Sequence, residues 1–99
     1  MNIKIHTLHF NADKKLEDLI ESKVGKIIQR NEDVISADVT LRLEKSQDMD
    51  NKVAEIKIEI PGNDLYARKQ SKSFEEAADI AVEAIRRQLK KYKEKKKGL

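Results

Sequence analysis

Basic side chains gather near the carboxyl end of the sequence, and their number and spacing favour one kind of chemistry. From Glu83 to Lys97 the chain has eight lysines and arginines and two glutamates, so this stretch carries 8 − 2 = +6. The remaining residues carry 13 − 16 = −3. A strongly positive segment on a mildly acidic remainder is typical of a protein that presents this segment to a polyanion. Nucleic acid is the obvious candidate.

The spacing of these bases fits a helix that keeps them away from the core. A stripe with spacings of four, three and four residues runs beside an apolar stripe and consists of Arg86, Lys90, Lys93 and Lys97. Arg87 and Lys91 fall on the solvent-facing side. This geometry favours phosphate binding, because each neutralised phosphate releases counterions and arginine can donate two hydrogen bonds to it. The general preference for bases at helix ends explains the last turn, but not eight bases over about three turns.

Two further groups of bases are candidates for the same surface. Lys23, Lys26 and Arg30 are spaced by three and four residues on an earlier predicted helix, away from its apolar face. An ordinary solvated face with ion pairs one turn apart explains this group equally well. Arg68 and Lys69 extend the surface if two helices on one sheet face bring their basic ends together. The predicted RNA-binding residues are Arg86, Arg87, Lys90, Lys91, Lys93, Lys23, Lys26, Arg30, Arg68 and Lys69.

The sequence carries no signal for catalysis or metal binding. His6 and His9 are the only histidines, and a spacing of three on a strand sends them to opposite faces. There is no cysteine, and three glycines are too few for a glycine-rich phosphate loop. With four aromatic residues in all, recognition should rest on phosphates and folded RNA shape and not on stacked bases. We therefore expect no enzyme, metal site, cofactor or small-molecule substrate.

The elements that must position the bases follow from hydrophobic periodicity. Residues 3–8 alternate as a half-buried strand, and Asp13 can cap a helix that runs to about Arg30. Residues 37–44 and 54–60 alternate as two antiparallel strands, joined by a polar, turn-prone stretch at 46–51. Pro61 and Gly62 suit the two central positions of a type II turn, after which a fourth strand is expected at about 65–70.

A second helix is predicted to carry the basic stretch. Ser73 and Glu76 have the spacing of a capping box, which marks its start, and Gly98 is expected to end it. Its apolar stripe keeps to one face for more than four turns and consists of Phe74, Ala78, Ala81, Val82, Ile85, Leu89 and Tyr92. The helix should therefore pack along the sheet over most of its length.

Residues 1–99 fit one domain, because a chain of this length with 38% apolar residues can bury one modest core. We predict the α+β class with the order β-α-β-β-β-α, a four-stranded antiparallel or mixed sheet and both helices packed on one face. The order of the strands stays open. The basic residues 94–99 are expected to form a tail that can fray. No window is long and apolar enough to cross a membrane, and a cytoplasmic protein without a membrane partner is expected.

The chain resembles the ribosome hibernation promoting factors, also called ribosome-associated inhibitors or ribosomal subunit interface proteins, over essentially its whole length. The most specific part is Ala67 together with the run from Ser73 to Lys93, S-F-E-E-A-A-D-I-A-V-E-A-I-R-R-Q-L-K-K-Y-K. Its ending matches the family at Arg87, Gln88, Leu89, Lys91 and Lys93. Lys23 and Lys26 also stand where the family carries bases. The chain departs from the family pattern at Thr7, Ser73 and Glu75, which usually are glycine, aspartate and tyrosine.

The resemblance implies binding to ribosomal RNA of the small subunit near the decoding region, where the protein overlaps messenger and transfer RNA. Translation then stops by occlusion, and ribosomes hibernate under stress or in stationary phase. Longer relatives carry an additional dimerising domain, and this chain is expected to lack a dedicated one.

Two other functions fit the residues. A double-stranded-RNA-binding-like module shares the α-β-β-β-α portion, but its lysines cluster at the start of the second helix, where this chain has Glu75 and Glu76. Alternatively, the basic helix of a protein-interaction module docks on an acidic partner. A cryptic enzyme pocket is a more distant alternative, which a turnover abolished by one carboxylate substitution would reveal.

Overall fold

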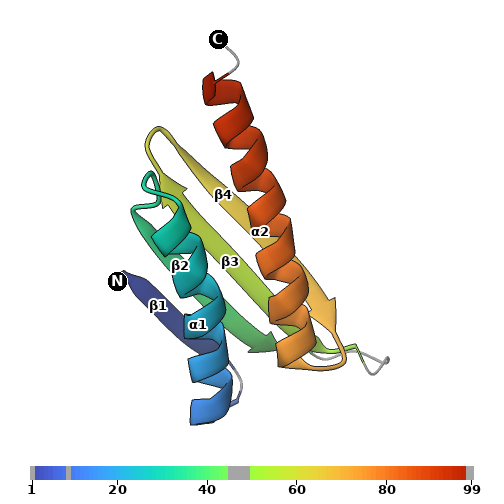
Figure 1. Ribbon diagram of the computed structural model, residues 1–99. Helices are drawn as coiled ribbons and strands as arrows, with labels where there is room; N and C mark the ends of the chain where they lie inside the picture. The colour runs from blue at the N-terminus through green and yellow to red at the C-terminus, as the bar shows by residue number, and fades with distance from the viewer. Residues whose placement is uncertain (1, 9, 45–49, 98–99) are drawn as a thin grey trace.

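The computed structural model describes residues 2–8, 10–44 and 50–97. Its elements are β1 (Ile3–Leu8), α1 (Lys14–Arg30), β2 (Ser36–Leu43), β3 (Lys52–Ile60), β4 (Asn63–Ser71) and α2 (Phe74–Lys97). The predicted order β-α-β-β-β-α and the α+β class are confirmed. Figure 1 shows one sheet with both helices on the same face, also as predicted.

The four strands lie side by side in the order of the chain, β1-β2-β3-β4. β1 pairs with β2 in parallel, and the other neighbours are antiparallel, so the sheet is mixed. A two-residue turn at Pro61 and Gly62 joins β3 to β4, because Ile60 pairs with Asn63. Gly62 has φ 78°, the left-handed value that the third position of a type II turn requires. β4 begins two residues earlier than the sequence indicated.

The hydrophobic core lies between the sheet and the helices. Val39, Leu41, Ile56 and Ile58 project from the sheet and are completely buried. The helices contribute apolar stripes: α1 buries Leu16, Ile20, Val24 and Ile27, and α2 buries the predicted Ala78, Ala81, Val82, Ile85 and Leu89 and also Ala77, which the sequence did not indicate. Tyr92 packs against this cluster, so α2 follows the core for most of its length. Its last turns project beyond the sheet (Figure 1).

Both helices begin at the same end of the molecule, next to each other. The Asp13 carboxylate accepts a hydrogen bond from the Leu16 N–H at 2.8 Å, and the Ser73 hydroxyl accepts one from the Glu76 N–H at 3.1 Å. Phe10 and Phe74 stack at this end with ring centroids 4.2 Å apart. The two caps start the helices, and the stacked rings hold the two helix starts side by side.

The helices run in the same direction from this shared start (Figure 1). The chain leaves β1, forms α1 and returns to a parallel neighbour β2, whereas α2 follows β4, which is antiparallel to β3. The acids in the first turns, Glu17 on α1 and Glu75 and Glu76 on α2, therefore lie at one end of the molecule. The basic carboxyl ends of both helices lie at the other.

Some sequence expectations lie outside the described residues. These are the helix stop at Gly98, the position of His9 relative to His6, and most of the polar stretch at 46–51. α2 continues as a helix through Lys97.

Candidate nucleic-acid interface

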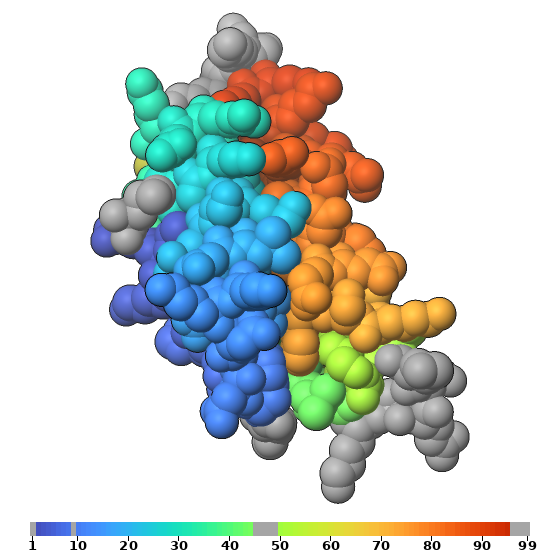
Figure 2. Space-filling view, turned by 60° about the horizontal axis from the view of Figure 1, so that its bottom comes forward, coloured from blue at the N-terminus to red at the C-terminus, as the bar shows by residue number. Residues whose placement is uncertain are grey.

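A shallow groove between the carboxyl ends of the two helices is lined mainly by bases. We call it the basic groove, and its lining residues are Asn31, Arg86, Leu89, Lys90 and Lys93. The Lys93 Nζ lies 3.5 Å from the main-chain oxygen of Arg30, which joins the end of α2 to the end of α1. Parallel helices thus bring together two helix ends that lie about sixty residues apart in the chain. Figure 2 shows α1 and α2 side by side on this face of the molecule.

A second group of bases lies on the other side of α2, toward β4. Lys69 and Arg87 line one hollow between α2 and β4, together with the acids Asp79 and Glu83. Lys91 follows Arg87 by one turn and is exposed. Of the two strand residues predicted to extend the surface, Lys69 is therefore next to the basic helix.

The bases of α2 are available to an external anion. Within the described part of the chain, Arg87, Lys90 and Lys91 form no ion pair, and Arg86 is paired only with Glu83 of its own helix, at 3.1 Å. Because this pair is exposed, with 44% and 53% of the two side chains accessible, it is weak and easily exchanged. Among the described residues, no ion-pair partner has to be displaced from Arg87, Lys90 or Lys91 before a phosphate binds.

The bases predicted on α1 have different surroundings. The Lys23 Nζ lies 2.8 Å from Oδ1 of Asp79 on α2, so this lysine bridges the two helices. The hydrogen bond and the charge of Lys23 lower the pKa of the Asp79 carboxyl below its ordinary value of 3.8. Lys26 and Arg30 are exposed, and Arg30 lies at the basic groove. Lys23 holds the helices together, whereas Lys26 and Arg30 remain open to solvent.

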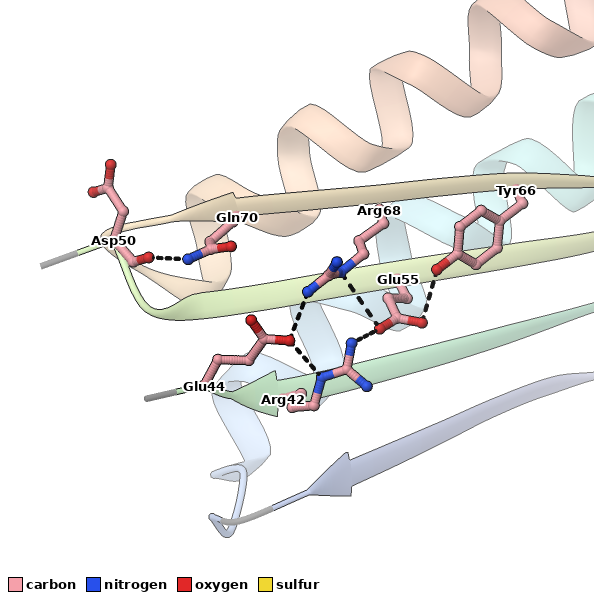
Figure 3. A network of polar contacts seen from close by, with 7 residues as sticks. All are labelled: Arg42, Glu44, Asp50, Glu55, Tyr66, Arg68 and Gln70. Atoms are coloured by element: carbon pink, nitrogen blue, oxygen red, sulfur yellow. Dashed lines mark hydrogen bonds and ion pairs between the residues drawn. The ribbon is translucent and has the colours of Figure 1, made fainter. Parts of the chain in front are cut away.

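Arg68 lies on the opposite face of the sheet, away from the helices. Its guanidinium contacts Glu44 at 2.6 Å and Glu55 at 3.8 Å. Arg42 is ion-paired with the same two carboxylates. Figure 3 shows the two arginines and two glutamates in one network on this open face. The structure thus does not bring Arg68 to the bases of the helices, although it is adjacent in sequence to Lys69.

Tyr66 and Gln88 take part in contacts that the sequence did not indicate. The Tyr66 hydroxyl donates to Glu55 at 2.9 Å, and the pKa of Tyr66 is raised by desolvation and by this carboxylate. On the edge of the sheet, the side-chain amide of Gln88 bonds the Tyr66 main chain twice. Gln88 stands out in the sequence only through its match to the family motif, and no local pattern predicts its partner.

Other kinds of site find no support in the described residues. No group of three or more metal-ligating side chains occurs among residues 2–8, 10–44 and 50–97. Neither described helix is long and apolar enough to cross a membrane. The unpaired bases around the end of α2 are therefore the candidate site.

Comparison with known proteins places the chain in a family. The sequence profile of the family described as "Sigma 54 modulation protein / S30EA ribosomal protein" matches residues 3–97. A ribosome hibernation promoting factor from Pseudomonas putida is 26% identical over 99 residues, which are 100% of this chain and 93% of that protein. A ribosome hibernation promotion factor from Bacillus subtilis is 30% identical over 97 residues, 96% of this chain and 50% of that protein.

Solved structures agree on the fold. A ribosomal subunit interface protein from Coxiella burnetii superposes with a TM-score of 0.83 at 20% identity, over 94% of this chain and 98% of that one. The N-terminal domain of Protein Y from Thermus thermophilus superposes with a TM-score of 0.77 at 22% identity, over 93% of this chain and 99% of that one. The resemblance to the ribosome hibernation promoting factors is thus confirmed, and the chain belongs to the Sigma 54 modulation protein / S30EA ribosomal protein family.

Proposed function

We propose that this protein inhibits translation by binding ribosomal RNA of the small subunit near the decoding region. The carboxyl ends of α1 and α2 meet the RNA, and the body of the domain occupies space that messenger and transfer RNA need. Ribosomes are thereby held inactive under stress or in stationary phase. The chain contributes no catalysis, acts in the cytoplasm and needs neither a cofactor nor a small-molecule substrate.

The observation that carries the proposal is a contrast between the open face of β2, β3 and β4 and the basic stretch of α2. On the open face of β2, β3 and β4, the three bases Arg42, Lys57 and Arg68 are all ion-paired with neighbouring carboxylates. On the helix side, Arg87, Lys90 and Lys91 have no such partner among the described residues. Unpaired bases close together raise one another's energy, and a polyanion relieves this repulsion while releasing its counterions.

The shape of the basic end also supports binding to a folded RNA. The basic groove, the outer side of α2 and the hollow at Lys69 and Arg87 form successive parts of one surface around the helix. The last turns of α2 extend past the sheet, so a bulky RNA can approach them without meeting the rest of the domain (Figure 1). A basic surface that spans the outer side of α2 and the hollows on both its sides can contact several phosphates of a folded RNA at once.

The first test asks which particle carries the protein. A native lysate is separated on a sucrose gradient, and the fractions are probed for the protein before and after ribonuclease treatment. We expect co-migration with small subunits or whole ribosomes, which ribonuclease abolishes. Co-migration with another protein complex after ribonuclease treatment would instead support the protein-interaction alternative.

The second test concerns occlusion. Purified small subunits are mixed with the protein, and binding of labelled messenger and transfer RNA is measured at rising protein concentration. We expect competition, and inhibition of translation in a purified system over the same concentration range. Simultaneous binding of all three molecules would contradict the proposed mechanism even if the protein binds the subunit.

A further inference from the structure

The side chain of Gln88 completes the edge of the sheet. β4 is an edge strand, so some of its main-chain groups point away from β3 and lack a strand partner. The Gln88 amide nitrogen donates to the Tyr66 carbonyl oxygen at 2.8 Å, and the Tyr66 N–H donates to the Gln88 Oε1 at 3.3 Å. A primary amide offers one donor and one acceptor side by side, as a neighbouring strand would.

This contact also anchors α2 within its basic stretch. Gln88 stands between Arg87 and the buried Leu89, and it faces β4 while the groove bases face α1. On the α1 side, the Lys23–Asp79 ion pair holds the helix at an earlier turn. The apolar core alone leaves a helix some freedom to roll and slide, because its side chains interlock without directional bonds. Two directed contacts on opposite sides reduce that freedom.

We propose that Gln88 is a positioning residue for RNA binding, because its paired hydrogen bonds to Tyr66 set the roll of α2 and hence the direction of Arg87 and Lys91. The proposal rests on the proposed function and deepens it. Gln88 itself need not contact RNA. We therefore expect RNA binding to depend on this neutral side chain, although its hydrogen bonds go to the Tyr66 main chain and not to the nucleic acid.

The main test compares Gln88→Met with the wild-type protein. Methionine keeps the length and helix preference of the side chain but makes neither hydrogen bond. Binding to purified small subunits is measured at several salt concentrations, together with the folded fraction under each condition. We expect weaker binding and a logarithmic salt slope that is smaller by roughly 0.7 to 0.9 for each phosphate that the variant no longer neutralises. Gln70→Met, which removes a side-chain hydrogen bond to the Asp50 main-chain oxygen on the open face of β4, is the matched control and should bind as wild type.

The salt slope separates positioning from stability. A variant that only unfolds more readily binds less at every salt concentration, but its folded molecules still neutralise the same number of phosphates. Reduced affinity with an unchanged slope would therefore overturn the proposal, and so would wild-type binding by Gln88→Met. If the wild-type protein itself ignores small subunits, the proposed function fails first, and this inference fails with it.

A second variant uses pH. In Gln88→Glu, an ionised carboxylate still accepts from the Tyr66 N–H but repels the Tyr66 carbonyl, whereas a protonated carboxyl can donate to that carbonyl again. We expect weak binding at neutral pH and recovery toward wild type on acidification, with each value normalised to wild type at the same pH. A binding defect independent of pH would contradict the role of the donated bond.

Discussion

The Lys93 Nζ lies 3.5 Å from the main-chain oxygen of Arg30, although 63 residues separate the two in the chain. The last carbonyl groups of a helix have no partner within it and carry partial negative charge. The ammonium group of Lys93 on α2 thus compensates the partial negative charge at the carboxyl end of α1. Because this contact needs parallel helices, it follows from the same geometry that concentrates the bases.

Reversing the charges at the end of α2 should abolish binding to small subunits. The triple variant Arg87→Glu, Lys91→Glu and Lys93→Glu replaces attraction to phosphate by repulsion. Its thermal unfolding should change little, because all three side chains are exposed and the contact of Lys93 with the Arg30 carbonyl is worth about 1 kcal/mol at most. Co-sedimentation and thermal unfolding are measured on the same preparations. Unchanged co-sedimentation would count decisively against the basic end as the RNA-binding surface.

A matched control changes the net charge equally at another place. Lys4, Lys14 and Lys15 are exposed, on β1 and at the start of α1. Reversing all three to glutamate gives the same total charge as the first triple variant, and we expect most of the binding to remain. Equal loss in both triples would mean that overall charge decides binding.

Arg68 and Arg87 should differ although they carry the same charge. Arg68→Met removes ion pairs with Glu44 and Glu55 on the open face, so unfolding should become easier by about 0 to 1 kcal/mol while RNA binding stays. Arg87→Met should leave stability unchanged and lower the salt slope of binding by roughly 0.7 to 0.9. Urea unfolding and salt-dependent binding distinguish them. A binding loss in Arg68→Met equal to that in Arg87→Met would place RNA on the open face.

The Lys23–Asp79 ion pair should stabilise the fold at neutral pH but not in strong acid. The folded-state pKa of Asp79 is lowered, so its contribution is present above the ordinary value of 3.8 and is lost as the pH falls through the lower folded value. Asp79→Asn should therefore unfold more easily than wild type at pH 7, and the difference should vanish at the acid end. A constant difference across this range would show that the charge of Asp79 is irrelevant.

Gly62 should be costly to replace although it has room for a side chain. A Cβ built at this position meets nothing within 4 Å, so the only penalty is the positive φ of 78°. Gly62→Ala should lower the free energy of unfolding by about 1 to 2 kcal/mol. Gly62→Asn should cost less, because asparagine tolerates left-handed backbone better. RNA binding should be unchanged in both, and equal stability of all three proteins would contradict the turn assignment.

The elements could be predicted because their signals are local. Alternation at 37–44 and 54–60, the apolar stripes of the helices and the caps Asp13 and Ser73 depend on neighbours within a few residues. The two-residue turn at Pro61 and Gly62 also determines which residues of β3 and β4 lie opposite each other. Counting five residues outward from the paired Ile60 and Asn63 puts Glu55 opposite Arg68, so the pairing of Arg68 followed from the turn length.

The contacts between elements could not be predicted in the same way. Lys23 meets Asp79 only because the helices are parallel and in a particular register, and Gln88 meets Tyr66 only because β4 lies at the edge. The strand order determines both conditions, and several orders satisfy the same alternation. The sequence predicts Lys23 as an RNA contact, and nothing nearby in the sequence indicates that it also pairs with Asp79.

The opposite charges at the two ends of the parallel helices also affect how the protein reaches a partner. In the field of a polyanion, the acidic end is pushed away and the basic end is pulled forward, so the molecule turns during approach before any contact forms. A larger fraction of collisions then leads to binding than random orientation would give. Added salt screens the charges and shortens the range of this orienting effect, so the association rate should fall as the salt concentration rises.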